Sequence, residues 1–282
     1  MASPENKMEV DPKALLHELV LAWQHHVPFQ TITSIATPHE DRHVPTMPEI
    51  KDDILKKMGG CCYQNNVGCY EILRALGFDV SLIACDIKNR NNHPVPIVNN
   101  ISHPGSQHLV DVGTSGYPTF LPVPLDFDKE SPEFHHSYLV YKFVREGDTI
   151  IRLHRADCDP AGAQRFGVKD GWYPFMVIHH KNPVEAAHFK VTMEKIYIKV
   201  LPSPPFLISP RVSAFPDGRF VCINNTTLLL ESEEDPGKVQ KTYLKSLDEL
   251  LDTYARFFPQ LPRQLVQTAL ADANVHLNFD KE

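Results

Sequence analysis

The sequence contains no apolar run long enough to cross a membrane, and its first residues, MASPENKMEVDPK, are polar and do not resemble a signal peptide. We therefore expect a cytoplasmic protein that does not associate with membranes. Basic residues are in the minority, with 28 Lys and Arg against 35 Asp and Glu and a formal net charge of -7. Because a nucleic-acid-binding protein is more often basic and no Lys/Arg stripe is visible, we expect no nucleic-acid partner.

Paired cysteines at short spacing are also lacking. No CxxC occurs among the six cysteines, which stand at positions 61, 62, 69, 85, 158 and 222. Structural zinc sites need paired Cys or His at short fixed spacing, so we expect no metal. Without a secretion signal, free thiols are favoured over a disulfide framework. The chain also has no G-x-G-x-x-G and no phosphate-binding loop.

Local patterns divide the 282 residues into three parts. Apolar residues recur at helical spacing in residues 1–80, where we expect helices from Pro12 to about Val27, from Pro48 to Met58 and from near Cys62 to a C-cap at Gly77. Residues 81–181 consist mainly of short strand-like runs, which predict a mostly antiparallel sheet or barrel. Residues 182–282 mix strand and helix signals.

Capping and turn signals locate elements in this last part. Asn182 to Glu185 is a capping signature that predicts a helix with Pro183 at its first position, running to about Tyr197. Residues 211–223, RVSAFPDGRFVCI, predict a hairpin around a Pro-Asp-Gly turn. A further capping box at residues 246–249 opens a helix, and a last helix is expected over 263–273.

The stretch KMGGCCYQNN, residues 56–65, contains the candidate nucleophile. Gly59 and Gly60 allow a sharp turn and a close backbone approach. Cys62 then falls in the first turn of a helix, where unpaired N–H groups and the partial positive charge favour thiolate, the nucleophilic form. The same pattern also fits a pair of small buried residues, Cys61 and Cys62.

A cysteine nucleophile needs a base, and the base needs a residue that orients it. Three histidines, His93, His103 and His108, precede the strand end HLVDVG, and chain position alone does not choose among them. Asp111 in that strand lies between apolar residues, where a carboxylate is costly unless paired. A hydrogen bond to an imidazole would pair the Asp111 carboxylate. Alternatively, Asp111 could cap a turn and His93 could lie in a surface loop.

Several segments resemble those of one known family and follow the same order along the chain. The chain has counterparts of the family's nucleophile signature, Arg-Gly-Gly-aromatic-Cys-x-Glu/Gln-Asn, and of its H-x-x-x-x-V strand. It also has counterparts of the V-D-x-G-F-G and Q-P-L segments and of the flanking I-P-F-E, S-P-x-S-x-F and T-P-D-G-R segments. They are MGGCCYQN at 58–65, HPVPIV at 93–98, VDVGTSG at 110–116 followed by PVPL, VPFQ at 27–30, SPPF at 203–206 and FPDGR at 215–219. Over nearly its whole length the chain resembles an arylamine N-acetyltransferase.

The resemblance implies an α+β fold with a cysteine-protease-like Cys-His-Asp core. Its parts would be an N-terminal helical bundle, 1–80, a central antiparallel β-barrel, 81–181, and a C-terminal α/β lid, 182–282. It implies a catalytic triad of Cys62, His93 and Asp111. It also implies a cytoplasmic enzyme of foreign-compound metabolism that takes an acyl group from acetyl-CoA or another acyl-CoA as a thioester, then passes it to an aromatic amine or hydrazine in a ping-pong reaction.

The resemblance also implies binding residues. Coenzyme A would contact backbone N–H groups of the turn Gly113, Thr114, Ser115 and Gly116, and Phe29 would contact the aromatic acceptor. A plain connecting turn and an ordinary core phenylalanine remain the alternatives.

The departures from the family pattern concern the nucleophile loop and the pocket. Met58 stands where the family has Arg, and Cys61 replaces a bulky aromatic residue. Thr114 stands where the family has Phe, with Ser115 as an extra residue. Smaller residues at 61 and 114 predict a roomier, more polar pocket, suited to an acyl group larger than acetyl or one that carries a carboxylate, such as malonyl.

Two prolines follow the candidate base. Pro94 and Pro96 cannot donate ladder hydrogen bonds, so we expect an edge or broken strand after His93. His103 and His108 remain the alternative bases.

Three rival classes remain on the sequence alone. A cysteine protease or transglutaminase-like enzyme would use the same triad chemistry. An acyl-transferring or cyclising enzyme of secondary metabolism could take its acyl group from a carrier protein. The chain could also be a non-catalytic binding homologue, although an intact Cys, His and Asp favour an enzyme.

Overall fold

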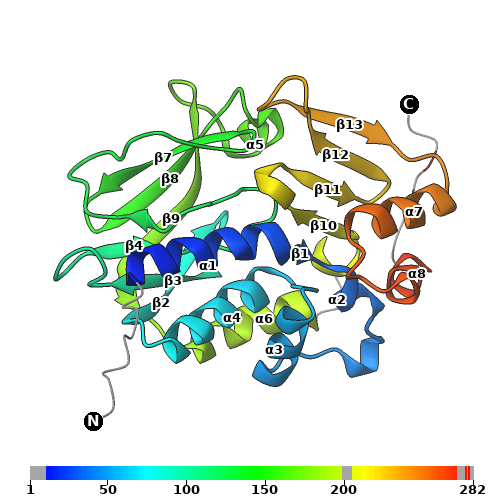
Figure 1. Cartoon of the computed structure of the whole chain (residues 1–282), viewed down its shortest axis with the longest axis horizontal. Coiled ribbons are helices and arrows are strands. Elements are labelled where there is room, and N and C mark those ends of the chain that lie inside the picture. The colour runs from blue at the N-terminus through cyan, green and yellow to red at the C-terminus, as the bar shows by residue number, and fades with distance from the viewer. Residues whose placement is uncertain (1–10, 199–204, 272–276, 278, 280–282) are drawn as a thin grey trace, which may run out of the picture.

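The computed structural model of the chain describes residues 11–198 and 205–271, together with Leu277 and Phe279. Figure 1 shows two β-sheets side by side, with most helices packed in front of them and below. The expected α+β class is confirmed, and the central sheet is a curled half-barrel that remains open between two edge strands. Ser203, Pro204 and the expected helix end at Ala273 lie outside the described residues.

Helices dominate the N-terminal part: α1 Pro12–His26, α2 Ile32–Ala36, the 3₁₀ turn η1 His39–Asp41, α3 Met47–Leu55 and α4 Cys62–Ala75. The start of α1 is confirmed, because the Asp11 side chain accepts a hydrogen bond from the Lys13 N–H at 3.0 Å and Pro12 occupies the first position. α3 ends at Leu55 rather than at Met58, because Lys57 adopts a left-handed φ of 57° that a right-handed helix does not allow.

The buried face of α1 packs against the helix that begins at Cys62. Leu16, Val20 and Trp23 are buried together with Leu73 of α4 and Val110 of the strand-end segment. The expected apolar stripe on α1 is therefore confirmed, and its burial joins the helices to the central sheet.

The central sheet is entirely antiparallel, with the order β5-β4-β3-β2-β9-β8-β7-β6. Its strands are β2 Val80–Ile87, β3 Asn89–Asn99, β4 Gln107–Leu109, β5 Val123–Pro124, β6 Phe134–His136, β7 Leu139–Glu146, β8 Thr149–Arg155 and β9 Trp172–Pro183. The short helix α5, Pro160–Phe166, lies between β8 and β9.

The prolines do not break β3, which corrects the expectation of a broken strand. Pro94 and Pro96 stand opposite Ala84 and Leu82 of β2 in a continuous register. Pro96 turns its carbonyl away from β2, where it accepts from the Val110 N–H at 2.9 Å. The nitrogen of Pro96 points to the same side as its carbonyl, so its lack of an N–H costs no hydrogen bond to β2. β4 pairs only from residue 97 onward, so the segment 93–96 is a local edge, as expected.

The predicted helix start at Pro183 is wrong, although a helix does end at Tyr197 as predicted. β9 continues to Pro183, which stands opposite Ile83 of β2, and the Val184 N–H donates to the Leu82 carbonyl at 2.8 Å. Pairing with β2 therefore overrides the local capping signature at Asn182. The chain then forms the 3₁₀ turn η2 Ala186–Phe189 and the helix α6 Lys190–Tyr197.

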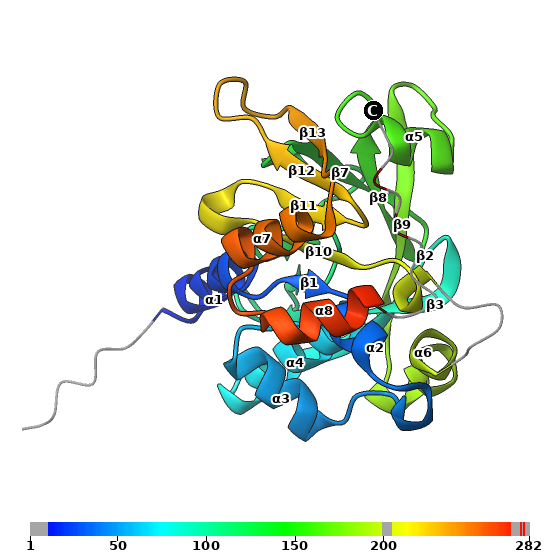
Figure 2. The ribbon, with the colours of Figure 1, turned by 90° about the vertical axis from the view of Figure 1, so that its right-hand side faces the viewer.

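A smaller antiparallel sheet has the order β1-β10-β11-β12-β13 and is covered by α7 and α8 (Figure 2). Its strands are β1 Phe29–Gln30, β10 Arg211–Ala214, β11 Val221–Asn224, β12 Thr227–Glu231 and β13 Val239–Tyr243. The same part of the chain contains the 3₁₀ turns η3 Pro205–Leu207 and η4 Pro216–Gly218 and the helices α7 Leu247–Phe257 and α8 Arg263–Ala271. The expected hairpin is confirmed as β10 and β11 around η4. The Ser246 cap of α7 is also confirmed, because its side chain accepts from the Glu249 N–H at 3.2 Å.

The strand β1 ties the N-terminal part to this small sheet. Phe29 pairs with Ser213 of β10, and the Gln30 N–H donates to the Gly60 carbonyl at 3.0 Å. The glycine turn before α4 is therefore fixed against the small sheet. The division into parts at residues 80 and 181 stays a prediction.

Candidate active site

Two glycines shape the turn before α4. Gly59 has a φ of 64°, and a Cβ placed on it would lie 1.9 Å from the Pro28 carbonyl oxygen. A Cβ on Gly60 would lie 2.3 Å from the Gln64 side chain. Glycine is required at 59, where the left-handed backbone and the Pro28 carbonyl leave no room for a side chain, while a side chain at 60 would displace Gln64. Cys61 is the N-cap that follows, and Cys62 is the first residue of α4, as predicted.

Gln64 holds this turn in place from the first turn of α4. Its Oε1 accepts from the Cys61 N–H at 3.0 Å and from the Tyr197 hydroxyl at 3.1 Å. Its Nε2 donates to Asp53 Oδ2 at 3.2 Å. Burial and the neighbouring Asp52 raise the pKa of Asp53 to about 6, so this carboxylate titrates close to neutral pH. One side chain therefore connects α3, α6 and the backbone just before the candidate nucleophile.

The thiol of Cys62 is partly exposed and lies at the edge of β3. Its Sγ is 4.0 Å from the Asn92 carbonyl oxygen, a weak contact. The thiol also lies near the His93 ring, because it contributes to raising the pKa of His93. The first residue of α4 and the middle of β3 thus bring a thiol and an imidazole into the same site.

The His93 ring is in turn paired with Asp111. The Nε2 atom lies 3.1 Å from both carboxylate oxygens, and both side chains are almost completely buried. Burial alone would favour the neutral ring, but the charge and hydrogen bonds of Asp111, with a smaller effect of Cys62, raise the pKa of His93 well above its usual range. Burial by itself would raise the pKa of Asp111, but the charge and hydrogen bond of His93, followed by the hydrogen bond of Thr114, lower it. The two groups therefore form an imidazolium–carboxylate pair at neutral pH.

Several donors make the buried carboxylate tolerable. Oδ1 of Asp111 accepts from Asn66 Nδ2 at 3.0 Å and from the Gly113 N–H at 3.2 Å. Its Oδ2 accepts from the Thr114 hydroxyl at 2.5 Å. The backbone carbonyl of Asp111 accepts from Gln24 of α1 at 3.3 Å. The carboxylate is thus fixed by three donors besides the imidazole.

Asn66 is a site residue that the sequence reasoning missed. Its Nδ2 also donates to the Pro94 carbonyl at 2.7 Å, and its Oδ1 accepts from the Val112 N–H at 2.9 Å. It is fully buried and joins α4, β3 and the segment that carries Asp111. The signal in the sequence was a pair of amides, Asn65 and Asn66, one helical turn after Cys62 on an otherwise buried helix face.

The two alternative bases lie elsewhere. His103 is exposed and contacts Asp126 at 3.1 Å. His108 is buried, and its Nε2 contacts the Ser102 hydroxyl at 3.1 Å. Of the three histidines considered, His93 is the one that pairs with Asp111 and whose pKa responds to Cys62.

The four residues predicted to bind coenzyme A divide into two pairs. Gly113 and Thr114 face the triad: a Cβ on Gly113 would lie 2.8 Å from the Cys62 carbonyl, and the Thr114 hydroxyl lies 3.2 Å from His93 Nε2. Ser115 and Gly116 instead line a neighbouring cavity of about 690 Å³. The Gly113 N–H is already used by Asp111, so it is not free for a ligand.

Phe29 and Cys61, the predicted substrate contacts, are both buried. They lie in one apolar cluster with Val67, Phe189 and Tyr197, which the Cys62 side chain joins from its edge. Burial raises the pKa of the Cys61 thiol, which keeps it protonated at neutral pH. Cys61 thus occupies space beside the site, and a direct contact of either residue with a substrate stays a prediction.

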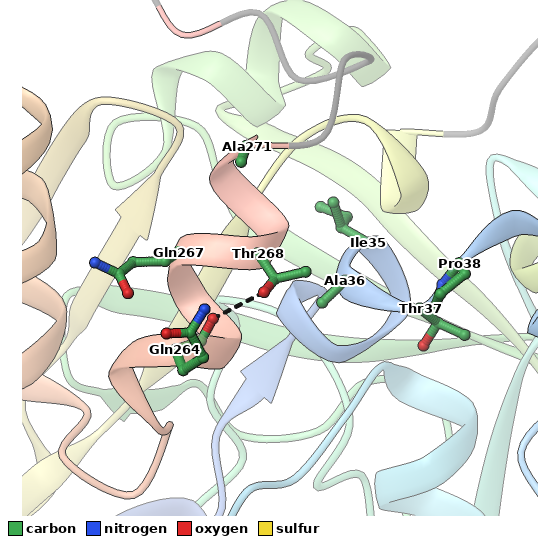
Figure 3. A pocket seen from close by; sticks show the side chains of 8 residues that line it. All are labelled: Ile35, Ala36, Thr37, Pro38, Gln264, Gln267, Thr268 and Ala271. Carbon is green, nitrogen blue, oxygen red and sulfur yellow. Dashed lines mark hydrogen bonds between the residues drawn. The ribbon is translucent and has the colours of Figure 1, made fainter.

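A further cavity of about 590 Å³ lies between α2 and α8 (Figure 3). Its walls are Ile35, Ala36, Thr37, Pro38, Gln264, Gln267, Thr268 and Ala271, all of which are uncharged. The Thr268 hydroxyl is bonded to the Gln264 carbonyl at 3.0 Å. This cavity offers no acid, base or nucleophile. Among the described residues there is also no group of His, Cys, Asp and Glu that could hold a metal ion, and no helix that could cross a membrane.

Comparison with known proteins gives a consistent result. A sequence profile described as N-acetyltransferase matches residues 14–264. Among curated proteins, a probable arylamine N-acetyltransferase 2 of Dictyostelium discoideum is 27% identical over 109 residues. That match spans 36% of the chain and 35% of the length of the relative.

Solved structures resemble the chain over almost its full length. An arylamine N-acetyltransferase of Mycobacterium smegmatis has a TM-score of 0.73 at 18% identity, covering 95% of this chain and 93% of its own. One of Mycobacterium marinum, solved in complex with CoA, has a TM-score of 0.73 at 17% identity and covers 94% of both chains. One of Nocardia farcinica has a TM-score of 0.74 at 19% identity, covering 94% and 89%. These likenesses show a shared fold.

Proposed function

The chain belongs to the arylamine N-acetyltransferase family, and from that premise we propose that it is an acyl-coenzyme A-dependent arylamine N-acyltransferase. One observation carries the proposal. The thiol of Cys62, at the start of α4, lies near enough to His93 to help raise its pKa, and His93 Nε2 lies 3.1 Å from both oxygens of the buried Asp111 carboxylate. This is the arrangement of a cysteine nucleophile, a base and the residue that orients the base.

The first half-reaction transfers the acyl group to the enzyme. The imidazolium of His93 already holds the proton of the Cys62 thiol, and the thiolate sulfur attacks the carbonyl carbon of the donor thioester. The bond between that carbon and the coenzyme A sulfur breaks, and the leaving sulfur takes the proton back from His93. The product is a thioester on Cys62, and the raised pKa of His93 suits it to hold the proton between these steps.

The second half-reaction transfers the acyl group to an aromatic amine or hydrazine. The amine nitrogen attacks the Cys62 thioester, the now neutral His93 accepts one proton from that nitrogen, and the Cys62 sulfur leaves as the thiolate, which restores the starting pair with protonated His93. Asp111 keeps one ring nitrogen protonated and the ring oriented throughout, because both its oxygens lie 3.1 Å from Nε2. Coenzyme A leaves before the amine enters, so the kinetics are ping-pong.

The donor is proposed from the cavity beside the triad. Ser115 and Gly116 line it, and they directly follow Thr114, whose hydroxyl lies 3.2 Å from His93 Nε2. Its volume of about 690 Å³ lies within the range of about 300 to 1,000 Å³ that is common for cofactor and drug-sized ligands. The acceptor is proposed to approach the partly exposed side of Cys62, near Phe29. A cytoplasmic location and a role in foreign-compound metabolism complete the proposal.

The acyl group is proposed to include groups larger than acetyl. Thr114 and Cys61 are both smaller than the family's aromatic residues at these positions, and Thr114 adds a hydroxyl. If acetyl-CoA acylates the protein far better than propionyl-CoA or malonyl-CoA, this part of the proposal is wrong while the transferase activity stands.

Intact-mass spectrometry after incubation with these three donors tests the proposal. We expect one acyl adduct on the wild-type chain, no adduct on Cys62→Ala, and an adduct on Cys61→Ala, because only the first substitution removes the reacting sulfur. Adding an aromatic amine should then discharge the adduct. Absence of an adduct with every coenzyme A donor would overturn the proposal in favour of a carrier-protein donor, another reaction or a non-catalytic homologue.

A further inference from the structure

The half-buried carboxylate of Asp53, on α3, is a titratable group beside the reaction site that the triad does not use. Its Oδ2 accepts from the Gln64 Nε2 atom at 3.2 Å. Its backbone carbonyl accepts from the Met58 N–H at 2.8 Å, immediately before the glycine turn. The side chain and backbone of Asp53 therefore bind the two ends of the segment 58–64, in which Cys62 lies.

The Gln64 amide holds the turn in one orientation only. Its Oε1 faces two donors, the Cys61 N–H and the Tyr197 hydroxyl, and its Nε2 faces Asp53. The side chain is almost completely buried and packs on the turn, since a Cβ on Gly60 would lie 2.3 Å from it. Turning the amide over would place its NH₂ group against the Cys61 N–H and its oxygen against a carboxylate. An acceptor at Asp53 therefore decides which way the amide points.

Burial and the charged groups of α3 disfavour the ionised form of Asp53. Burial has the largest effect, followed by repulsion from Asp52, and together they raise the pKa of Asp53 to about 6. Glu49 adds a smaller repulsion, while the hydrogen bond from Gln64 and the charge of Lys56 act in the opposite direction. Lys56 itself pairs with Asp52 at 2.6 Å. The carboxylate is therefore ionised at pH 7 and protonated at pH 5.

A cavity of about 240 Å³ gives solvent protons access to Asp53. On the wall before α3, the Arg42 guanidinium donates to two carbonyls at the end of α2, and the His43 ring contacts Glu49 at 2.8 Å. A backbone hydrogen bond and then Glu49 raise the pKa of His43, so this ring also changes charge near neutral pH. On the α6 wall, burial raises the pKa of Tyr197, so its hydroxyl is neutral.

We propose that Asp53 is a positioning residue for the acylation of Cys62. In its ionised form it fixes the Gln64 amide, and the amide fixes the Cys61 N–H at the start of α4. Protonation of Asp53 weakens that hold and slows acylation in mildly acidic solution. The inference rests on the proposed function and deepens it, because it names a residue that sets the acid limit of the first half-reaction without touching the reacting atoms.

The direction of the effect follows from the donors that each form of Asp53 offers. An ionised carboxylate only accepts, and hydrogen bonds to a charged acceptor are about twice as strong as neutral ones. A protonated carboxyl group accepts more weakly and brings a donor of its own, which competes with the Cys61 N–H for the Gln64 Oε1 atom. Below the pKa of Asp53 the turn before Cys62 is therefore held less firmly, and acylation becomes slower.

Single-turnover acylation of Cys62 by saturating acetyl-CoA, measured from pH 5 to pH 8, tests the inference. In the wild type we expect the rate to rise about three- to tenfold through a step near pH 6, as expected for strengthening one hydrogen bond by a charge. Asp53→Asn accepts without a charge at every pH, so its rate should be low and should lack the step. A step of unchanged size and position in Asp53→Asn would overturn the inference.

Further variants assign the step to one group. Asp52→Asn removes the repulsion that helps to raise the pKa of Asp53, so the step should move to lower pH and keep its size. His43→Gln should leave the step in place, and a step that disappears in this variant would belong to the imidazole and overturn the inference. Asp248→Asn, at an exposed position on α7, is the control and should leave the whole profile unchanged.

Reversing the polarity of the hydrogen bond separates positioning from loss of structure. Gln64→Glu alone removes the donor and places a second carboxylate against Asp53, so acylation should slow at neutral pH. Adding Asp53→Asn supplies a side-chain donor to the new carboxylate, which still accepts from the Cys61 N–H. The double variant should recover most of the rate lost in Gln64→Glu. No recovery in a double variant that thermal melting shows to be folded would overturn the inference, and if it does not fold, the pH profile of Asp53→Asn decides.

Alkylation of Cys62 by iodoacetamide gives a readout that needs no acyl donor. Because the turn also sets how the thiolate meets the first N–H groups of α4, its rate should show the same step near pH 6 in the wild type and none in Asp53→Asn. If no donor acylates Cys62 but this step is present and depends on Asp53, the proposed function fails and the positioning role stands. If acylation proceeds without a step that Asp53→Asn removes, the proposed function stands and this inference is wrong.

Discussion

The Thr114 hydroxyl donates to Asp111 Oδ2 at 2.5 Å and lies 3.2 Å from the Nε2 atom of His93. The residue that stands in place of a family phenylalanine is therefore in direct contact with the orienting carboxylate and the base. Its hydroxyl gives Oδ2 a second partner and limits the positions that the carboxylate can take. Thr114 thus affects the triad as well as the room in the pocket.

Replacing Thr114 by Val should show this. We expect Thr114→Val to slow acylation of Cys62 several-fold and to lower the free energy of unfolding by about 1 to 2 kcal/mol, because a charge-assisted hydrogen bond is lost at nearly constant volume. Stopped-flow acylation and urea unfolding measure the two effects. Thr114→Ser keeps the hydroxyl and should retain most of both, so equal losses in the Ser and Val variants would assign the effect to the methyl group instead.

Asn66 is expected to matter as much for stability as for the reaction. Asn66→Ala removes donors to Asp111 and Pro94 and leaves the buried Val112 N–H without an acceptor. We expect a loss of about 2 to 4 kcal/mol in the free energy of unfolding and slower acylation. Gln267→Ala, an exposed amide on α8, is the matched control and should change stability by less than about 0.5 kcal/mol. Similar values for both variants would contradict this role of Asn66.

The parts of the fold that the sequence predicted are those with local causes. Asp11 and Pro12 start α1, Ser246 caps α7, and the Pro-Asp-Gly turn joins β10 to β11, since each depends on neighbours in the chain. Pro183 shows where prediction from local sequence signals fails. Its capping signature was valid locally, but pairing with Ile83 of β2, a hundred residues earlier in the chain, extends β9 through it.

The same difference between local and distant causes applies to the residues of the site. The place of Cys62 at a helix start could be predicted from Gly59 and Gly60, because the turn and the helix are local. The role of Asn66 could not, since its partners Pro94, Asp111 and Val112 lie far along the chain. The choice of His93 over the other histidines needed the family resemblance, because sequence spacing does not show which ring faces Asp111.

Selective alkylation should single out Cys62 among the six cysteines. Cys61, Cys69, Cys85 and Cys222 are buried, and burial raises the pKa of each, so they are protonated and inaccessible. With limiting iodoacetamide at pH 7, peptide mapping should find the label first on Cys62. Cys158 is also partly exposed and is the internal control. Label that appears on Cys158 as fast as on Cys62 would argue against activation by His93.

The pH dependence of stability should report the buried His93–Asp111 pair. The pKa of Asp111 is lowered on folding, so its contribution is present above its unfolded value of about 3.9 and is lost as the pH falls through the folded value. The pKa of His93 is raised to about 10, so its contribution is complete below the unfolded value of about 6.5 and declines as the pH rises toward the folded one. The pair therefore stabilises the fold most between about pH 4 and about pH 6.5.

Urea unfolding of the wild type and of His93→Gln at several pH values measures this contribution. The difference in free energy of unfolding should be largest near pH 5.5 and should shrink by pH 9, because the unfolded wild-type chain no longer binds a proton at His93 there while the folded chain still does. His103→Gln, at an exposed histidine whose pKa is raised by Asp126, provides the control and should give a much smaller difference, since exposed ion pairs are weak. A difference for His93→Gln that is the same at pH 5.5 and pH 9 would mean that the ring is neutral in the folded protein, and the proton transfers proposed for it would then have to start from the neutral imidazole.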